Sequence, residues 1–225
     1  TIDIARDLSN SLVRVAKGAG LHCEAILTDM NQVLGKSAGH TLEILECIKY
    51  IKNDFKDHRL EKITNELISS LLVNIYKISK EEAYNKINTV INNGLAAEKF
   101  EMMVAALGGP KNILTSYEKD LTNTSIQKDI FSIEGGWIEN IHTRELGLIL
   151  IELGGGRKQV TDKINYGVGY DNVLNIGDEV NSSTPLLSLY SSKNIDDNLI
   201  NKIKGCFIIS DKKTQKLSEI FETIN

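Results

Sequence analysis

The sequence has no apolar run approaching the roughly 20 residues that a membrane-spanning helix needs, and its opening residues lack the pattern of a signal peptide. It also lacks an excess of basic residues. Its 26 Lys and Arg stand against 30 Asp and Glu, which gives a formal net charge of −4. A dedicated nucleic-acid surface normally carries a basic excess. We therefore expect neither membrane insertion nor nucleic-acid binding.

Cysteine and histidine are scarce and scattered. The three cysteines, Cys23, Cys47 and Cys206, are odd in number and lack metal-ligand spacing, which is typical of a reducing, cytoplasmic protein with inert thiols. No two histidines have the spacing of a helical metal site. We expect exposed or structural roles for all four, at positions His22, His40, His58 and His142. Nucleophile-elbow, Walker and dinucleotide-binding motifs are also lacking.

Helical periodicity dominates the first half of the chain. Ile4, Leu8, Leu12 and Val15 predict an opening helix that ends at the glycines near residue 20. A short buried strand is predicted at 23–28. Further helices are predicted by the apolar positions of 42–51 and 60–75, by the capping-box pattern at Ser79 and Glu82, and by the run that ends at Gly108.

The second half reads differently. From about Ser125, short β-rich runs alternate with glycine-containing turns. We expect strands at 129–134, 136–141, 146–153, 185–192 and 204–210, with one helix at 195–203. The sequence thus predicts an α/β region at 1–122 and a small, mainly β domain at 123–225.

The polar loop between the predicted strand and the next helix is the first candidate site. Asp29 follows the strand, where ligands bind in open α/β sheets, although an Asp that only caps the loop is equally compatible with the pattern. Glu43 and Glu46 share one helical face. Glu46 either forms an ion pair with Lys49 or gives its carboxylate to a cation held by loop carbonyls. The ion pair is the simpler interpretation.

The glycine-rich stretch Gly154–Lys158 is a second candidate. Its backbone N–H groups and Arg157 would suit a phosphate. No obvious helix follows it, however, so the pattern favours a tight turn.

Four stretches closely resemble bacterial thymidine phosphorylases and their pyrimidine-nucleoside phosphorylase relatives. They are AILTDMNQVLGKSAGHTLEILECI, NNGLAAEKFEMMVAALGGP, HTRELGLILIELGGGRKQVTDKINYGVGY and IGDEVNSSTPLLSLYS, and they follow the family's order. The resemblance implies the C-terminal half of such an enzyme. Its fold would be the later part of the α/β domain, followed by a small C-terminal domain with a hammerhead and barrel-sandwich-like β architecture.

The family's activity implies a pentosyltransferase of pyrimidine salvage. Such an enzyme cleaves thymidine reversibly with inorganic phosphate, giving thymine and 2-deoxyribose 1-phosphate, and the intact protein would be a homodimer. The family's Gly-rich phosphate motif and its base-binding Arg and Ser-x-x-Lys residues do not occur in these 225 residues. We therefore assign no catalytic or substrate-binding residue here and expect this chain alone to be inactive. Because it begins without Met, we also expect a fragment or a processed product.

The resemblance further implies one bound ion, a monovalent cation, potassium; no other cofactor is expected, and the phosphate and nucleoside would be bound by the half that these residues lack. The ligands of the cation here would be the main-chain oxygens of Leu34 and Ser37 and the carboxylate of Glu46. A different class of function stays open, namely a non-catalytic binding or assembly module that retains the family fold. A carrier domain is less favoured, because no Met-Lys-Met turn is present.

Overall fold

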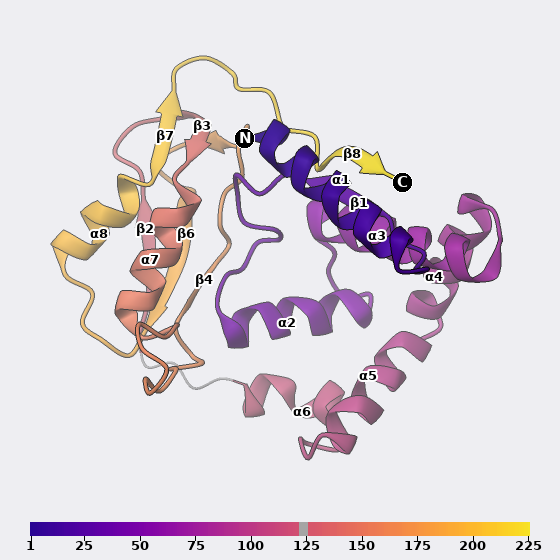
Figure 1. Cartoon of the computed structure of the whole chain (residues 1–225). Helices are drawn as coiled ribbons and strands as arrows, with labels where there is room; N and C mark the ends of the chain where they lie inside the picture. Colours follow the sequence, from indigo (N-terminus) through magenta and orange to yellow (C-terminus); the bar gives the residue numbers. More distant parts are fainter. Residues whose placement is uncertain (122–125) are drawn as a thin grey trace. The chain divides into compact units, whose positions relative to one another are not determined.

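The computed structural model describes residues 1–121 and 126–225 (Figure 1). Helices and three small antiparallel sheets alternate along these residues, so the predicted mixed α/β fold class is confirmed. The predicted domain boundary at 122/123 falls on residues 122–125, which lie outside the described residues. That boundary stays a prediction.

The chain folds as two compact units, and neither is continuous in sequence. The first unit contains Thr1–Met30, His58–Thr89 and Ser218–Asn225. The second contains Asn31–Asp57 and Val90–Leu217. Both ends of the chain therefore belong to the first unit, and each unit is described by itself below.

The first unit pairs two strands that are distant in sequence. β1 (Ala25–Thr28) runs antiparallel to β8 (Ile220–Ile224), with Ala25 opposite Ile224. Helix α1 (Ile2–Gly18) lies beside this sheet (Figure 1), and its Val13 packs with Leu27 and Ile224 in a small core. The predicted opening helix and short strand are both present in the structure.

Two further helices, α3 (His58–Tyr76) and α4 (Lys80–Asn92), follow the predicted periodicity. The capping box before α4 is formed as expected. The Ser79 N–H donates to Glu82 Oε2 at 2.8 Å, and the Glu82 N–H donates to Ser79 Oγ at 3.1 Å. These reciprocal bonds satisfy two N–H groups that a helix start leaves without intrahelical partners.

Three helices of the second unit share one small core. They are α2 (His40–Ile51), α5 (Leu95–Ala106) and α6 (Ile113–Asp120). Ile48 of α2 is fully buried and packs with Ile113 and Tyr117 of α6. This packing fixes the position of α2, the helix that carries Glu46.

The second unit also contains two three-stranded antiparallel sheets, with the strand orders β2-β6-β4 and β5-β3-β7 (Figure 1). A single large core lies between them, centred on fully buried Ile138, Leu187 and Leu189. The elements are β2 (Ile126–Phe131), β3 (Gly136–Ile141), α7 (Thr143–Leu153), β4 (Gly169–Asp171), β5 (Glu179–Val180), β6 (Pro185–Ser191), α8 (Asp197–Lys204) and β7 (Phe207–Ser210).

The strand predicted at 146–153 is wrong, because this segment is part of helix α7. Leu146, Ile149 and Leu153 are its buried residues, at helical spacing. Gly154 ends the helix in the left-handed conformation, with φ 100°. A continuous apolar run of this length fits either a buried strand or a buried helix, so tertiary packing made the choice.

A close backbone approach ties the second unit together. Ala38 and Tyr170 form an isolated antiparallel bridge, with N–H···O distances of 3.0 and 2.7 Å. Two glycines permit it. A Cβ on Gly169 would lie 2.7 Å from the Ala38 carbonyl oxygen, and a Cβ on Gly39 would lie 2.6 Å from the Val168 carbonyl oxygen.

Across residues 1–121 and 126–225, no helix combines the length and apolar character that crossing a membrane would require.

We expect Gly169→Ala to lower the free energy of unfolding of the second unit by about 1–3 kcal/mol, because the added methyl group meets fixed backbone. Gly147→Ala is the matched control: nothing lies within 4 Å of its added Cβ, and the residue is exposed within α7. The control should stabilise the helix by about 0.5–1 kcal/mol. Urea unfolding followed by the fluorescence of Trp137, the single tryptophan, measures both. Equal effects of the two changes would contradict the close-approach argument.

Candidate functional site

Glu46 of helix α2 binds the predicted polar loop through several hydrogen bonds. The Lys36 N–H donates to Glu46 Oε1 at 2.8 Å, and the Ser37 N–H and hydroxyl donate to Glu46 Oε2 at 3.2 and 2.5 Å. Helix α2 begins at His40, so its second turn reaches back to the segment before it. A carboxylate that accepts this many bonds fixes the loop backbone strongly, since charge-assisted bonds are about twice as strong as neutral ones.

Gly35 makes this closure possible. A Cβ at this position would lie 2.6 Å from Glu46 Oε2, far inside van der Waals contact. The loop backbone and the Glu46 carboxylate can therefore approach each other only where position 35 has no side chain.

Lys36 anchors the other side of the loop. Its Nζ donates to Asn175 Oδ1 at 2.6 Å and to Asp178 Oδ2 at 3.3 Å. Its carbonyl oxygen accepts from the Val173 N–H at 3.0 Å. Lys216 approaches the other oxygen of Asp178, at 2.9 Å. One carboxylate thus holds two ammonium groups, one from the loop and one from the segment before β8.

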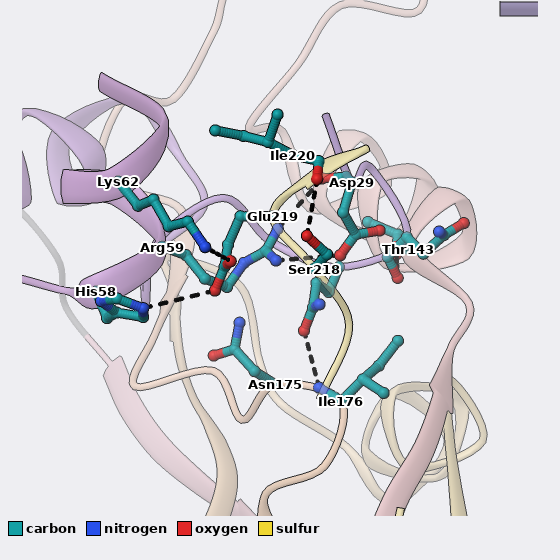
Figure 2. A network of polar contacts seen from close by, with 12 residues as sticks. Asp29, His58, Arg59, Lys62, Thr143, Asn175, Ile176, Ser218, Glu219 and Ile220 are labelled. Atoms are coloured by element: carbon teal, nitrogen blue, oxygen red, sulfur yellow. Dashed lines mark hydrogen bonds and ion pairs between the residues drawn. The ribbon is translucent and has the colours of Figure 1, made fainter. Parts of the chain in front are cut away.

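Two more bonds fix the start of the loop. The Ile176 N–H donates to the Oε1 atom of buried Gln32 at 2.8 Å, a bond drawn at the labelled Ile176 in Figure 2. The Thr143 hydroxyl donates to the Asn31 carbonyl oxygen at 2.7 Å. The loop is therefore bonded at residues 31, 32, 36 and 38 to segments more than a hundred positions later in the chain.

Asp178 stays ionised well into the acid range. Burial alone would raise the pKa of this carboxyl, but the Asn175 N–H and the ammonium groups of Lys216 and Lys36 outweigh burial and lower the pKa. The negative charge that holds Lys36 is consequently present at neutral pH.

A pocket of about 220 Å³ opens beside this arrangement. Lys36 and Glu46 line it together with Lys49 and Asp171, so both signs of charge face its interior. Leu42, Leu45, Phe55 and Asn172 complete the lining. Charged and apolar groups thus share a pocket large enough for a small polar ligand.

The structure brings the three predicted cation-site residues together on one loop and the facing helix. Ser37 is buried, Glu46 is half-buried and Leu34 is 44% exposed. The predicted alternative, an ion pair of Glu46 with Lys49, is not found among the described residues, because the carboxylate contacts the loop instead. Likewise, within residues 1–121 and 126–225, no three His, Cys, Asp or Glu side chains converge on a metal position.

Asp29 has a structural partner in the first unit. Its side chain is 1% exposed, and Arg59 Nη1 donates to Oδ2 at 3.1 Å while Nη2 donates to the Asp29 carbonyl oxygen at 3.2 Å (Figure 2). The Asp29 N–H donates to the Glu219 carbonyl oxygen at 3.0 Å. The structure thus favours the loop-capping interpretation of Asp29 over a ligand contact.

Glu219 makes the adjoining polar contacts. Lys62 lies 2.7 Å from its carboxylate and His58 lies 3.8 Å from it (Figure 2). Burial opposes ionisation of this carboxyl, but the bond from Lys62 prevails and the pKa of Glu219 is lowered. These contacts hold the chain just before β8 against α3.

The glycine-rich candidate is a closed turn, as the sequence favours. The Lys158 and Gln159 N–H groups donate to Asp162 Oδ2 at 3.0 and 2.9 Å, and Arg157 Nε donates to the Asp162 carbonyl oxygen at 3.2 Å. The Asp162 carboxylate therefore already accepts the backbone N–H groups that a bound phosphate would need. Sequence reasoning missed this carboxylate, four residues beyond the glycine-rich stretch.

Sequence reasoning also missed Asn175 and Asp178. The run Asn175–Asp178 contains turn-forming residues, and that signal predicts a local turn. It contains nothing that identifies Lys36, 139 positions earlier, as the partner of Asn175. Only the folded second unit brings these residues together.

Comparisons with known proteins show what this chain is similar to. Residues 137–210, which run from β3 to the end of β7, match the pyrimidine nucleoside phosphorylase C-terminal domain. The chain is also 40% identical to the thymidine phosphorylase of Colwellia psychrerythraea over 191 residues. The resemblance predicted from the motifs is thus confirmed. The match covers 84% of this chain and 44% of that relative, so the chain spans less than half of the relative's length.

We expect Glu46→Gln to loosen the loop. The amide NH₂ that replaces one carboxylate oxygen faces N–H donors, so at least one bond to Lys36 or Ser37 is lost, at a cost of about 1–3 kcal/mol. Hydrogen exchange at these two amides should accelerate about tenfold or more. Glu43→Gln is the matched control, because Glu43 accepts from the Gly39 N–H, at 2.7 Å, and not from Lys36 or Ser37. Unchanged exchange at Lys36 and Ser37 in Glu46→Gln would refute the closure by Glu46.

Because the Asp178 carboxylate holds Lys36, the free energy of unfolding should depend on pH. The pKa of Asp178 lies below its ordinary value of 3.8 in the folded protein. Its stabilising contribution is therefore fully present above about pH 4 and is lost as pH falls through the lower, folded pKa. Asp178→Asn should remove about 1.5–3 kcal/mol at pH 7 and progressively less below pH 4. Urea unfolding of both proteins from pH 7 to pH 2.5 tests this; a difference that is constant with pH would contradict it.

Proposed function

We propose that the chain is part of a thymidine phosphorylase, a pentosyltransferase that converts thymidine and phosphate reversibly to thymine and 2-deoxyribose 1-phosphate. The identity of 40% over 84% of the chain, to a relative of that name, carries this proposal. The reaction belongs to pyrimidine nucleoside salvage. The substrates would be bound by residues outside this chain, because none of its own residues matches the family's phosphate or base motifs.

This chain would contribute by holding the loop around Lys36 in a fixed position. Phosphorolysis brings two substrates together and depends on groups held at fixed places. The loop around Lys36 is held from two sides, by Glu46 of α2 and by Asn175 and Asp178 of the segment between β4 and β5. Such a loop supplies a rigid wall, because its bonds are formed before any substrate arrives.

We further propose that the loop holds a monovalent cation, potassium, through the main-chain oxygens of Leu34 and Ser37 and the carboxylate of Glu46. The donor set fits, since hard cations select oxygen ligands. Each carboxylate oxygen has two lone pairs, so the bonds that Glu46 accepts from Lys36 and Ser37 leave it further capacity. When bound, the cation would supply fixed positive charge near a phosphate. The residues here would orient it and limit water around it.

The second candidate function is a binding or assembly module without chemistry. It is favoured by one observation: the 225 residues contain no Gly-rich phosphate motif. In this case the bonds around Lys36 would hold a docking surface instead of a reaction centre.

For the enzyme, we propose that the intact protein is a homodimer.

The activity assay is phosphate-dependent release of thymine from thymidine. The chain alone should show none. A chimera that places the unmatched portion of the Colwellia enzyme before Thr1 should release thymine, and Glu46→Gln in this chimera should lower the rate while Glu43→Gln should not. The Colwellia enzyme itself serves as the positive control.

Each outcome of this assay decides between the candidates. Turnover by the chain alone would refute its predicted inactivity. A folded chimera without turnover would count against the enzyme and in favour of the binding module.

A further inference from the structure

A two-residue turn, Asn93 and Gly94, joins helix α4 to helix α5 (Figure 1). It is the only Asn-Gly pair in the 225 residues. Both residues are exposed, and Gly94 has a left-handed backbone with φ 80°. Glycine adopts this conformation without steric cost, because it has no Cβ. The turn thus places an accessible side-chain amide directly before a backbone nitrogen that no side chain shields.

An asparagine in this position can react with its own main chain. The Gly94 nitrogen attacks Asn93 Cγ, a five-membered succinimide forms, and ammonia leaves. Water then opens the ring. Opening at Cγ gives aspartate, whereas opening at the main-chain carbonyl carbon gives isoaspartate, in which the main chain runs through the former side chain. In sum, one amide and one water become one carboxylate and one ammonium ion.

The structure holds the two reacting atoms in one small ring. Asn93 Oδ1 accepts from the Leu95 N–H at 3.1 Å. The ring that this bond closes contains both Asn93 Cγ and the Gly94 nitrogen, so the side chain is already folded back towards that nitrogen. The Gly94 N–H donates to the Ile91 carbonyl oxygen at 3.3 Å, a longer bond than the usual length of about 2.9–3.0 Å. Little hydrogen bonding is therefore lost when the nitrogen attacks.

Two Asn-Ser pairs of the same chain serve as internal comparisons. Asn181 lies in an exposed turn, and its Oδ1 accepts from the Ser183 N–H at 2.9 Å, the same local bond as at Asn93. Its next residue, however, carries a side chain. Asn10 lies within helix α1, whose backbone is held in helical hydrogen bonds. Asn93 alone combines the turn with a following glycine.

The turn leads into a helix that supports the candidate site. Phe100 and Val104 of α5 pack in the core around Ile48 of α2, the helix that carries Glu46. An isoaspartate adds one carbon to the main chain just before α5 and removes the side-chain oxygen that accepts from Leu95. We propose that the Asn-Gly turn is a self-modifying site, and that its isoaspartyl product loosens the first turn of α5. The inference is independent of the proposed activity, since it needs only this chain and water.

Incubation of the purified chain in warm, mildly alkaline buffer tests the modification. Peptide mass spectrometry should show a gain of one dalton at Asn93, at least about tenfold faster than at Asn181 or Asn10, because only glycine leaves the attacking nitrogen unhindered. The rate should rise with pH, because this nitrogen must lose its proton. Isoaspartyl methyltransferase with labelled S-adenosylmethionine should label the same peptide, since direct hydrolysis of the side chain would give aspartate alone.

Two variants make the test specific. Asn93→Ser keeps an oxygen that can accept from the Leu95 N–H, and its mass should stay constant. Gly94→Asn adds a side chain to the attacking residue while tolerating the left-handed backbone, and should slow conversion about tenfold or more. Circular dichroism checks that both variants are folded. Hydrogen exchange at Leu95 should be about tenfold faster or more in the purified isoaspartyl form than in the unmodified chain.

Four results would overturn the inference. They are a constant mass at Asn93, equal conversion at Asn93 and Asn181, conversion that yields no isoaspartate, and unchanged exchange at Leu95 in the isoaspartyl form. A folded chimera that releases no thymine would count against the proposed activity and leave this inference standing.

Discussion

The bonds that hold the loop around Lys36 are the constraint on which the second unit depends. The carbonyl oxygen of Lys36 accepts from Val173, and its N–H donates to Glu46. Its ammonium group donates to Asn175 and Asp178. A loop of this kind would ordinarily be mobile. Here its position in the second unit is fixed, because helix α2 and the segment between β4 and β5 both bond to it.

This constraint explains several local features at once. Gly35 leaves room for the Glu46 carboxylate, and Gly39 and Gly169 let two backbones approach closely enough to form the bridge at Ala38 and Tyr170. The predicted cation ligands Leu34, Ser37 and Glu46 are adjacent as a result of the same closure. Whichever function the chain serves, these bonds hold the loop and the Glu46 carboxylate of α2 in fixed positions.

Much of the secondary structure could be predicted from the sequence, and the errors have a physical pattern. The opening helix, the short strand at β1, the capping box at Ser79 and the turn at Gly154–Lys158 follow from local rules of periodicity and hydrogen bonding. Helix α7 was missed because a continuous apolar run has the same composition in a buried strand and a buried helix. The roles of Asp162 and Asp178 were missed because acidic residues in turns are common and their partners are not marked in the local sequence.

The sequence by itself determined the family resemblance, since its motifs occur in order along the chain, and it determined most helices, since their periodicity is local. It also pointed to Glu46, through the resemblance. Only the tertiary structure decided that Asp29 pairs with Arg59 and that Lys36 bonds to Asn175 and Asp178. It also decided that the larger apolar side chains of α1, from Ile4 to Val15, are exposed. These outcomes depend on interactions between residues as many as 142 positions apart, and a pattern confined to neighbouring residues does not contain them.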